Sequence, residues 1–116
     1  MVAAMKRLVL FAILLTASAP ALAGASKFTL VNGTGGALAG LSITRSGTQD
    51  WKSIGPAPAA GARTAVDFSN PDCAFDIRAD VAGKGAVTWA GVNLCDVKSV
   101  TLKRDDSAGA WVDYDQ

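Results

Sequence analysis

The sequence contains no histidine and no glutamate, so its ten acidic side chains are all aspartates. The missing histidine excludes the Ser-His-Asp and Cys-His catalytic sets and the zinc sites that depend on imidazole ligands. Only two cysteines are present, and a bond between them would leave no thiol nucleophile. We therefore expect a protein that is not an enzyme and that binds no cofactor.

Long apolar runs are also scarce: one strong run covers residues 8–15, and Lys6 and Arg7 stand just before it. Small residues ending at Ala23 follow, which completes the pattern of a secretory signal peptide with a helical apolar part. We expect cleavage after Ala23 or, at a second position, after Ala25. The run is too short to cross a bilayer, so an uncleaved anchor is the weaker alternative. The pattern predicts a periplasmic or secreted protein without membrane insertion after cleavage.

Residues 1–23 are thus assigned to the signal peptide, and residues 24–116 to a single disulfide-tied β-domain. Removal of Lys6 and Arg7 with the leader leaves nine basic against ten acidic side chains. A nearly neutral surface does not favour nucleic acid as the partner, because that binding needs many cations facing the phosphates. We expect a protein or a small molecule as the ligand, and a monomer.

The clearest strand pattern covers residues 73–81, where apolar and polar side chains alternate without a break. Alternation of this kind indicates a strand with one buried and one solvated face. Residues 83–85 (GKG) then supply the glycines of a hairpin loop. Beyond Gly91 the apolar residues change parity, which predicts a bulge or bend there.

A turn centred on Lys84 would pair Ala79 with Trp89 and Cys73 with Cys95. The same register thus buries the apolar side chains and brings the two sulfur atoms together. Two buried free thiols are the alternative, but the export leader favours a disulfide. In the loop-entropy model such a bond stabilises the domain by about 3 kcal/mol.

Alternating or β-branched segments predict further strands, and we expect them over residues 27–32, 38–45, 63–68, 97–103 and 110–114, with a short extended segment near Ile54. No helical periodicity occurs outside the leader. About seven strands at regular spacing are typical of an all-β antiparallel sandwich; a small open barrel is the alternative. Residues 55–61 contain two prolines and are expected to form a surface loop.

Residues 32–36 (NGTGG) are expected to form a turn after the first strand. Asn32 and Thr34 also match the acceptor pattern for an N-linked glycan, which we discount because the Ala-rich leader is typical of bacteria.

Several short segments resemble a family of small exported proteins of Gram-negative bacteria. They are residues 28–35 (FTLVNGTG), 41–43 (LSI), 46–47 (SG), 50–51 (DW), 73–79 (CAFDIRA) and 89–95 (WAGVNLC). The family pattern is roughly F-x-L-x-N-x-T-G, D-W, C-x-[FY]-D-I-R and W-x-G-[VL]-[DN]-L-C, and the resemblance spans most of residues 28–102. It implies an exported β-domain without an established activity. Some members bear the enzyme name argininosuccinate lyase, a reaction whose acid–base side chains this chain lacks.

The resemblance fails after Trp51. The family usually continues with glycine and acidic residues, whereas this chain has Lys52-Ser53-Ile54 and then the proline-rich loop. A role of that segment in the family is therefore not transferred to this chain.

Asp50 and Trp51 are the candidate binding residues, because an acid and an aromatic side chain in a loop suit ligand contact. The alternative is that Trp51 folds back and covers the edge of the sandwich. The resulting hypothesis is a non-enzymatic envelope protein that acts as a binding module.

Two other functions are carried as alternatives. Asp105, Asp106 and Asp113 are weak candidates for a calcium-dependent module, although no EF-hand pattern is present and solvated turn carboxylates are the preferred explanation. A fibre subunit completed by strand exchange is the second, but residues 24–27 make a short donor segment.

Overall fold

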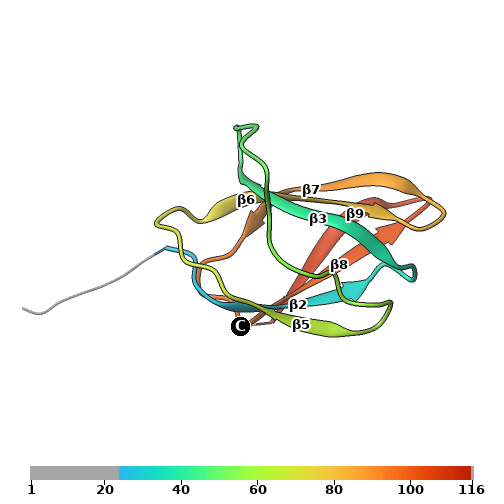
Figure 1. The fold of residues 1–116 in the computed structure, drawn as a ribbon, viewed down its shortest axis with the longest axis horizontal. Coiled ribbons are helices and arrows are strands. Elements are labelled where there is room, and N and C mark those ends of the chain that lie inside the picture. The colour runs from blue at the N-terminus through green and yellow to red at the C-terminus, as the bar shows by residue number, and fades with distance from the viewer. Residues whose placement is uncertain (1–23, 116) are drawn as a thin grey trace, which may run out of the picture.

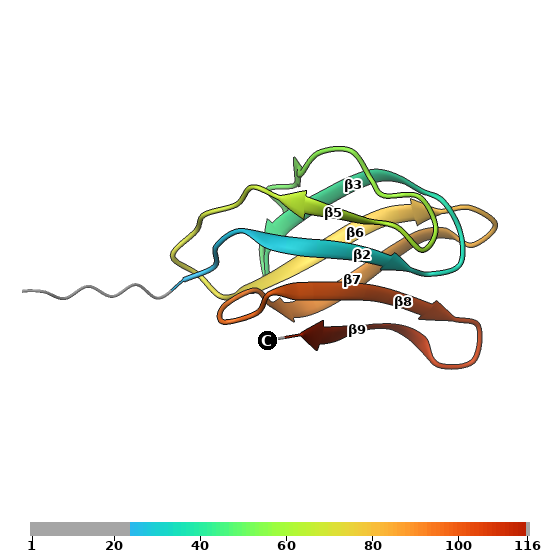
Figure 2. The same cartoon turned by 90° about the horizontal axis from the view of Figure 1, so that it is seen from below.

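The computed structural model describes residues 24–115, which form two four-stranded sheets stacked face to face (Figures 1 and 2). The expected signal-peptide helix lies outside the described residues. No helix long and apolar enough to span a membrane occurs between residues 24 and 115. The strands are β2 (Phe28–Gly33), β3 (Leu38–Arg45), β4 (Lys52–Ser53), β5 (Arg63–Val66), β6 (Ala74–Val81), β7 (Gly85–Asn93), β8 (Ser99–Asp105) and β9 (Gly109–Asp115).

One sheet has the strand order β5-β2-β8-β9 and the other has the order β4-β3-β6-β7. Figure 2 shows the first sheet in front of the second. The all-β sandwich is therefore confirmed, and the sheets do not close into a barrel. The structure has eight strands rather than about seven, because the short extended segment before Ile54 pairs with β3 as β4.

The predicted antiparallel arrangement has one exception among the pairs of strands. β2 and β8 run parallel, with Leu30 opposite Val100 and Asn32 opposite Leu102. Alternation of apolar residues reports which face of a strand is buried, but it is the same for either direction of the partner. The parallel pair is possible because about 65 intervening residues, with five strands and their connections, return the chain to the same end of the sheet.

The core lies between the two sheets, and its members alternate along each strand as the pleat requires. Leu30, Ile77, Val100 and Leu102 are completely buried. Trp89 is also buried, and its indole Nε1–H donates to the backbone oxygen of Lys103 at 2.8 Å. Since Trp89 belongs to β7 and Lys103 to β8, this bond fastens one sheet to the other.

The hairpin of β6 and β7 forms as expected, but its register differs by two residues. Val81 lies opposite Gly85, and Trp89 lies opposite Ile77 rather than Ala79. The loop is residues 82–84, so its centre is Gly83 and not Lys84. A shift of two residues moves every pair along the ladder and leaves each side chain on its predicted face, because the strand period is two.

Two other features of this hairpin are confirmed. The register slips by one residue near Gly91, where φ is +65° and the apolar parity changes. Cys73 and Cys95 lie just beyond the paired strands and form a disulfide, with 5.1 Å between their Cα atoms. The backbone N–H of Leu94 donates to the oxygen of Cys73 at 2.9 Å, so the ladder continues up to the bond.

Asn32, expected where the first strand meets the turn, lies in β2 next to its last residue and is fully buried, which the sequence did not indicate. Its side-chain nitrogen donates to the backbone oxygens of Gly36 and Pro58, at 2.8 and 3.0 Å. Its side-chain oxygen accepts from the N–H and the hydroxyl of Thr34, at 3.1 and 2.6 Å. Asn32 thereby holds the turn of residues 33–36 against the proline-rich loop, and in the folded protein it is inaccessible to a glycan.

Candidate functional site

The sandwich is closed along one side and open along the other. Cα atoms of β7 and β9 approach within 8 Å of each other, and the backbone N–H of Asn93 donates to the hydroxyl of Tyr114 at 2.9 Å. The opposite side is bordered by β4 and β5, the other edge strands of the two sheets. The segment between β4 and β5 crosses from one sheet to the other here, and the segment between β5 and β6 crosses back (Figure 1).

A cleft of about 370 Å³ lies on this open side. Its apolar floor is formed by Ile43, Phe68 and Phe75. The Phe68 ring is half-buried and packs edge-on against Phe75, with 5.1 Å between the centroids. The remaining lining residues are polar or belong to the loop that follows β5: Thr44, Arg45, Thr48, Asp50, Lys52, Asn70, Pro71 and Asp72.

Two ion pairs stand on the rim of the cleft. Arg45 Nη1 lies 3.1 Å from Asp72 Oδ2 and joins the end of β3 to the loop before Cys73. Lys52 Nζ lies 3.4 Å from Asp50 Oδ2 on the other wall. All four side chains are well exposed, so each pair contributes little to stability. The charges of the lining residues sum to zero.

Asp50 thus lines the cleft, whereas Trp51, its predicted partner in binding, does not. The half-buried Trp51 ring packs under the guanidinium of Arg78, 3.9 Å from the ring centroid, and its Nε1–H donates to Gln49 Oε1 at 3.2 Å. Arg78 alternates with the buried Ile77 on β6, so this pair lies on the outer face of the sheet. The structure therefore places the two candidates in different environments.

The other residues of the cleft were not identified from the sequence. Phe68 was expected at the end of a strand and Asp72 in a turn, and neither signal distinguishes a cleft from an ordinary edge. Phe68 and Asp72 reach the cleft because the loop between β5 and β6 folds back toward β3. The Arg45–Asp72 contact joins that loop to β3. A tertiary contact of this kind leaves no local pattern.

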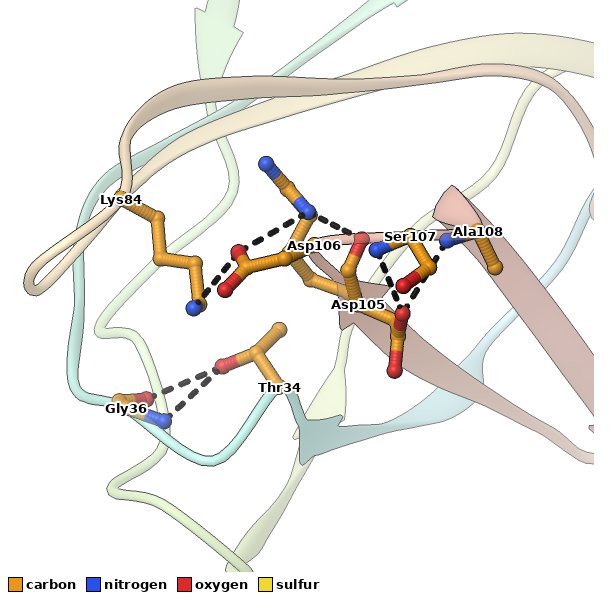
Figure 3. A network of polar contacts seen from close by, with 8 residues as sticks. Thr34, Gly36, Lys84, Asp105, Asp106, Ser107 and Ala108 are labelled. Carbon is orange, nitrogen blue, oxygen red and sulfur yellow. Dashed lines mark hydrogen bonds and ion pairs between the residues drawn. The ribbon is translucent and has the colours of Figure 1, made fainter.

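Two of the weak calcium candidates, Asp105 and Asp106, lie at the opposite end of the sandwich, where three connecting loops meet (Figure 3). Asp105 Oδ1 accepts the backbone N–H groups of Ser107 and Ala108, at 2.7 and 3.0 Å. The N–H of Ala108, and next that of Ser107, hold the pKa of Asp105 below its usual value. Asp105 therefore shapes the turn between β8 and β9.

Asp106 and Asp113 do not join Asp105 in a ligand set. Asp106 Oδ1 pairs with Lys84 Nζ at 2.9 Å and lies 3.7 Å from Arg104 Nη1, as Figure 3 shows. Asp113 lies on β9 opposite Thr101, four residues along the strand from the row of Asp105. No group of three side chains suited to a metal ion is found within residues 24–115.

Comparison with known proteins supports the architecture alone. No family model and no curated protein matches the chain. A solved structure described as the NMR structure of the protein from Eubacterium rectale is similar at 16% sequence identity, over 80% of this chain and 90% of that one, with a TM-score of 0.50. Likeness at this identity extends to the fold, and the family resemblance stays a prediction.

Proposed function

We propose that this chain is an exported, non-enzymatic binding module and that the cleft on the open side of the sandwich is its binding site. The observation that carries the proposal is the cleft itself. Core side chains there border a cavity that opens to solvent between two rim ion pairs. An apolar floor with a few polar groups around it is the usual composition of a ligand site.

The amino-acid composition supports a role in binding rather than catalysis. The sequence offers no histidine or glutamate as an acid–base group. Its two cysteines are joined, so neither thiol is free to act as a nucleophile. The rim aspartates are exposed and paired with cations, which is an ordinary environment for a carboxylate.

The disulfide and the N-terminal sequence together support export. A disulfide persists in an oxidising compartment outside the cytoplasm, and the leader pattern of residues 1–23 is that of a signal peptide. The periplasm or the exterior of the cell is the compartment that this proposal implies.

A fragment screen followed by NMR tests the binding site. The exported, oxidised protein is labelled with ¹⁵N and titrated with small aromatic, aliphatic and charged fragments. We expect amide shifts that cluster on Thr44, Arg45, Thr48 and Asn70, because their side chains line the cleft. Hits that cluster elsewhere, or no hits at all, would contradict the proposal.

Trp51→Ala provides the matched control for the screen. This variant removes the aromatic ring on the outer face of the sheet and the Arg78 contact, but it leaves the lining of the cleft in place. We expect lower stability and unchanged binding of the fragments. Loss of the cleft hits in a folded Trp51→Ala protein would move the site to the outer face.

The alternative functions have less support. Asp105 Oδ1 is used by the backbone of its own turn and Asp106 Oδ1 by Lys84, and within residues 24–115 no third acidic side chain joins them to complete a calcium ligand set. A fibre subunit awaits a strand from its neighbour, whereas each sheet here has four strands of its own. An unchanged melting temperature in calcium and in chelator is the expected result.

A further inference from the structure

We propose that the cleft receives one apolar side chain from an extended segment of a partner protein, with charges of both signs on either side of that side chain. This inference rests on the cleft being the binding site, as proposed above. It names the class of ligand, which the fold alone leaves open.

The shape of the cleft favours an anchor side chain over an enclosed small molecule. Ile43 and Phe75 are 4% and 2% exposed, so they offer only a small apolar surface. The cleft opens between the β3–β4 connection on one side and the loop that follows β5 on the other, whereas a small-molecule site encloses most of its ligand. One side chain can fill the floor while the rest of the ligand stays outside. That is how anchor residues bind at protein interfaces.

The charges on the rim favour a segment that carries both signs. Arg45 and Lys52 supply two cations, and Asp50 and Asp72 supply two anions. A ligand with charges of one sign would attract half of the rim and repel the other half. A segment with one charge of each sign finds a complementary partner for both.

The existing ion pairs leave room for such contacts. The Arg45–Asp72 pair uses one guanidinium nitrogen and one carboxylate oxygen. Arginine has five N–H donors and a carboxylate has two oxygens, so both side chains keep unused capacity. The rim can therefore bind a charged segment without first losing its own contacts.

The neighbouring backbone favours an extended segment. β4 covers only Ser42 and Ile43 of β3, and β5 is a four-residue edge strand on the facing sheet. Exposed strand edges are common docking places for extended peptides. Thr44 and Arg45 of β3 line the cleft beyond the part of the strand that β4 covers, so an extended segment beside them would place alternate side chains into the cleft and away from it.

Blocked tripeptides provide the test. The probes are acetyl-Lys-Leu-Asp-amide and the reversed acetyl-Asp-Leu-Lys-amide, and their binding is followed by the amide shifts of Thr44, Thr48 and Asn70. We expect at least one of these two peptides to bind. Replacing its leucine with alanine should weaken binding about tenfold, because most of the buried apolar surface is lost. Peptides with two lysines or two aspartates should bind about threefold more weakly.

Variants of the protein distinguish the effect of the rim charges from the effect of the protein's net charge. Asp50→Lys leaves the rim with three cations and one anion, and it should weaken binding of the mixed-charge peptide about threefold or more. Asp113→Lys makes the same change in net charge on β9, in the other sheet, and should have no effect. The double variant Asp50→Lys with Lys52→Asp restores a balanced rim and should restore binding.

The remaining outcomes contradict either the inference about the peptide ligand or the proposed binding site. Free leucine binding as tightly as the tripeptide would make the ligand a small molecule and overturn the inference. Equal binding of peptides with one sign of charge would do the same. If fragments occupy the cleft but no peptide does, the inference fails and the proposed function stands. If neither fragments nor peptides bind, both fail.

Discussion

The side chain of Asn32 makes four hydrogen bonds from a completely buried position at the end of β2. Its partners lie in the following turn and in the proline-rich loop, 26 residues along the chain at Pro58. A buried amide in this arrangement fixes two loops that have no regular structure of their own. Its removal leaves the oxygens of Gly36 and Pro58 and the N–H of Thr34 without these partners.

Asn32→Ala should therefore lower the free energy of unfolding by about 3 kcal/mol, as expected for breaking a buried hydrogen-bond network. Urea unfolding followed by tryptophan fluorescence measures the change. Thr34→Val is the graded control, because it removes the hydroxyl alone and should cost about 1 kcal/mol. An Asn32→Ala protein as stable as the parent would show that the network contributes nothing.

Asp105 should make stability depend on pH in the acid range. Its pKa is lowered in the folded state by the N–H groups of Ala108 and Ser107. The stabilising contribution is therefore complete above the unfolded pKa of about 3.9, and it is lost as the pH falls through the lower folded value. Asp105→Ala should thus be less stable than the parent at pH 7, and the two proteins should converge at acid pH.

Thermal unfolding between pH 2 and pH 7 measures this difference. Asp67→Ala removes an exposed carboxylate at the end of β5, and it serves as the control for the loss of one negative charge. A gap between Asp105→Ala and the parent that stays constant down to pH 2 would contradict the assignment.

Single-residue roles were predictable from the sequence only where the signal is local. The pattern N-x-T-G-G is the same for a surface turn and for a buried asparagine that holds one, so the position of Asn32 was missed. The partner that decides between them is Pro58, and nothing in either segment identifies the other. Cys73 and Cys95 were easier, since they are the only two cysteines and the hairpin between them brings their ends together.

At the scale of elements, the β6–β7 hairpin shows what a pattern can determine. Alternation gave the correct buried face of both strands, but the turn was placed one residue too late and the register was wrong by two. Alternation cannot detect a register shift of two residues, because every side chain stays on the same face of its strand. The register then depends on which residue centres the turn, and the two glycines around Lys84 allow a turn centred on Gly83 or on Lys84.

The disulfide should contribute strongly to the stability of this hairpin. Its cysteines are 22 residues apart, and closing a loop of that length stabilises the folded state by about 3 kcal/mol in the entropy model. The double variant Cys73→Ala with Cys95→Ala should lose about that much in urea unfolding. The parent protein treated with a thiol reductant should behave alike, and equal stability with and without reductant would contradict the prediction.

The pairing of β2 with β8 could not be predicted. Both strands have clear alternation, but their residues lie about 70 positions apart, and no signal specifies either the partner or its direction. The close approach is visible only in the structure. A side chain at Gly33 would place its Cβ 2.7 Å from Thr101 Cγ2 and 3.1 Å from the backbone oxygen of Leu102.

At the scale of the whole molecule, the sequence predicted the fold class and one residue of the cleft. Asp50 was found because a charged residue beside an aromatic one in a loop suggests a surface for binding. The floor residues were missed since Ile43 and Phe75 look like ordinary core positions, and they are core positions. The cleft exists because β7 and β9 close one side of the sandwich while β4 and β5 leave the other open.

The contacts of Gly24 and Ala25 distinguish between the two predicted cleavage positions. The backbone of Ala25 exchanges hydrogen bonds with Asn70, donating at 2.7 Å and accepting at 3.1 Å, and its side chain is buried. Gly24 has a φ of +103°, and a Cβ there would lie 2.5 Å from the oxygen of Asn70. Both residues fit the fold, so cleavage after Ala23 keeps these contacts and cleavage after Ala25 removes them.

We therefore expect the intact mass of the exported protein to correspond to a chain that starts at Gly24. A protein shortened to start at Ser26 should be less stable by about 2 kcal/mol, because it loses the three backbone hydrogen bonds of Ala25 and a buried methyl group. An exported product that starts at Ser26, or a shortened form of equal stability, would refute this expectation.

The parallel pair also sets an order of assembly. Translation delivers the chain from its N-terminus, and β2 must wait for both of its neighbours, of which β8 comes almost last. The strands of the other sheet are all present once residue 93 has emerged, two residues before the second cysteine. A growing chain can thus complete one sheet while β2, its first strand, has β5 but not yet β8 beside it. Premature release at that stage would expose the apolar side of a finished sheet, which is the kind of surface that chaperones bind.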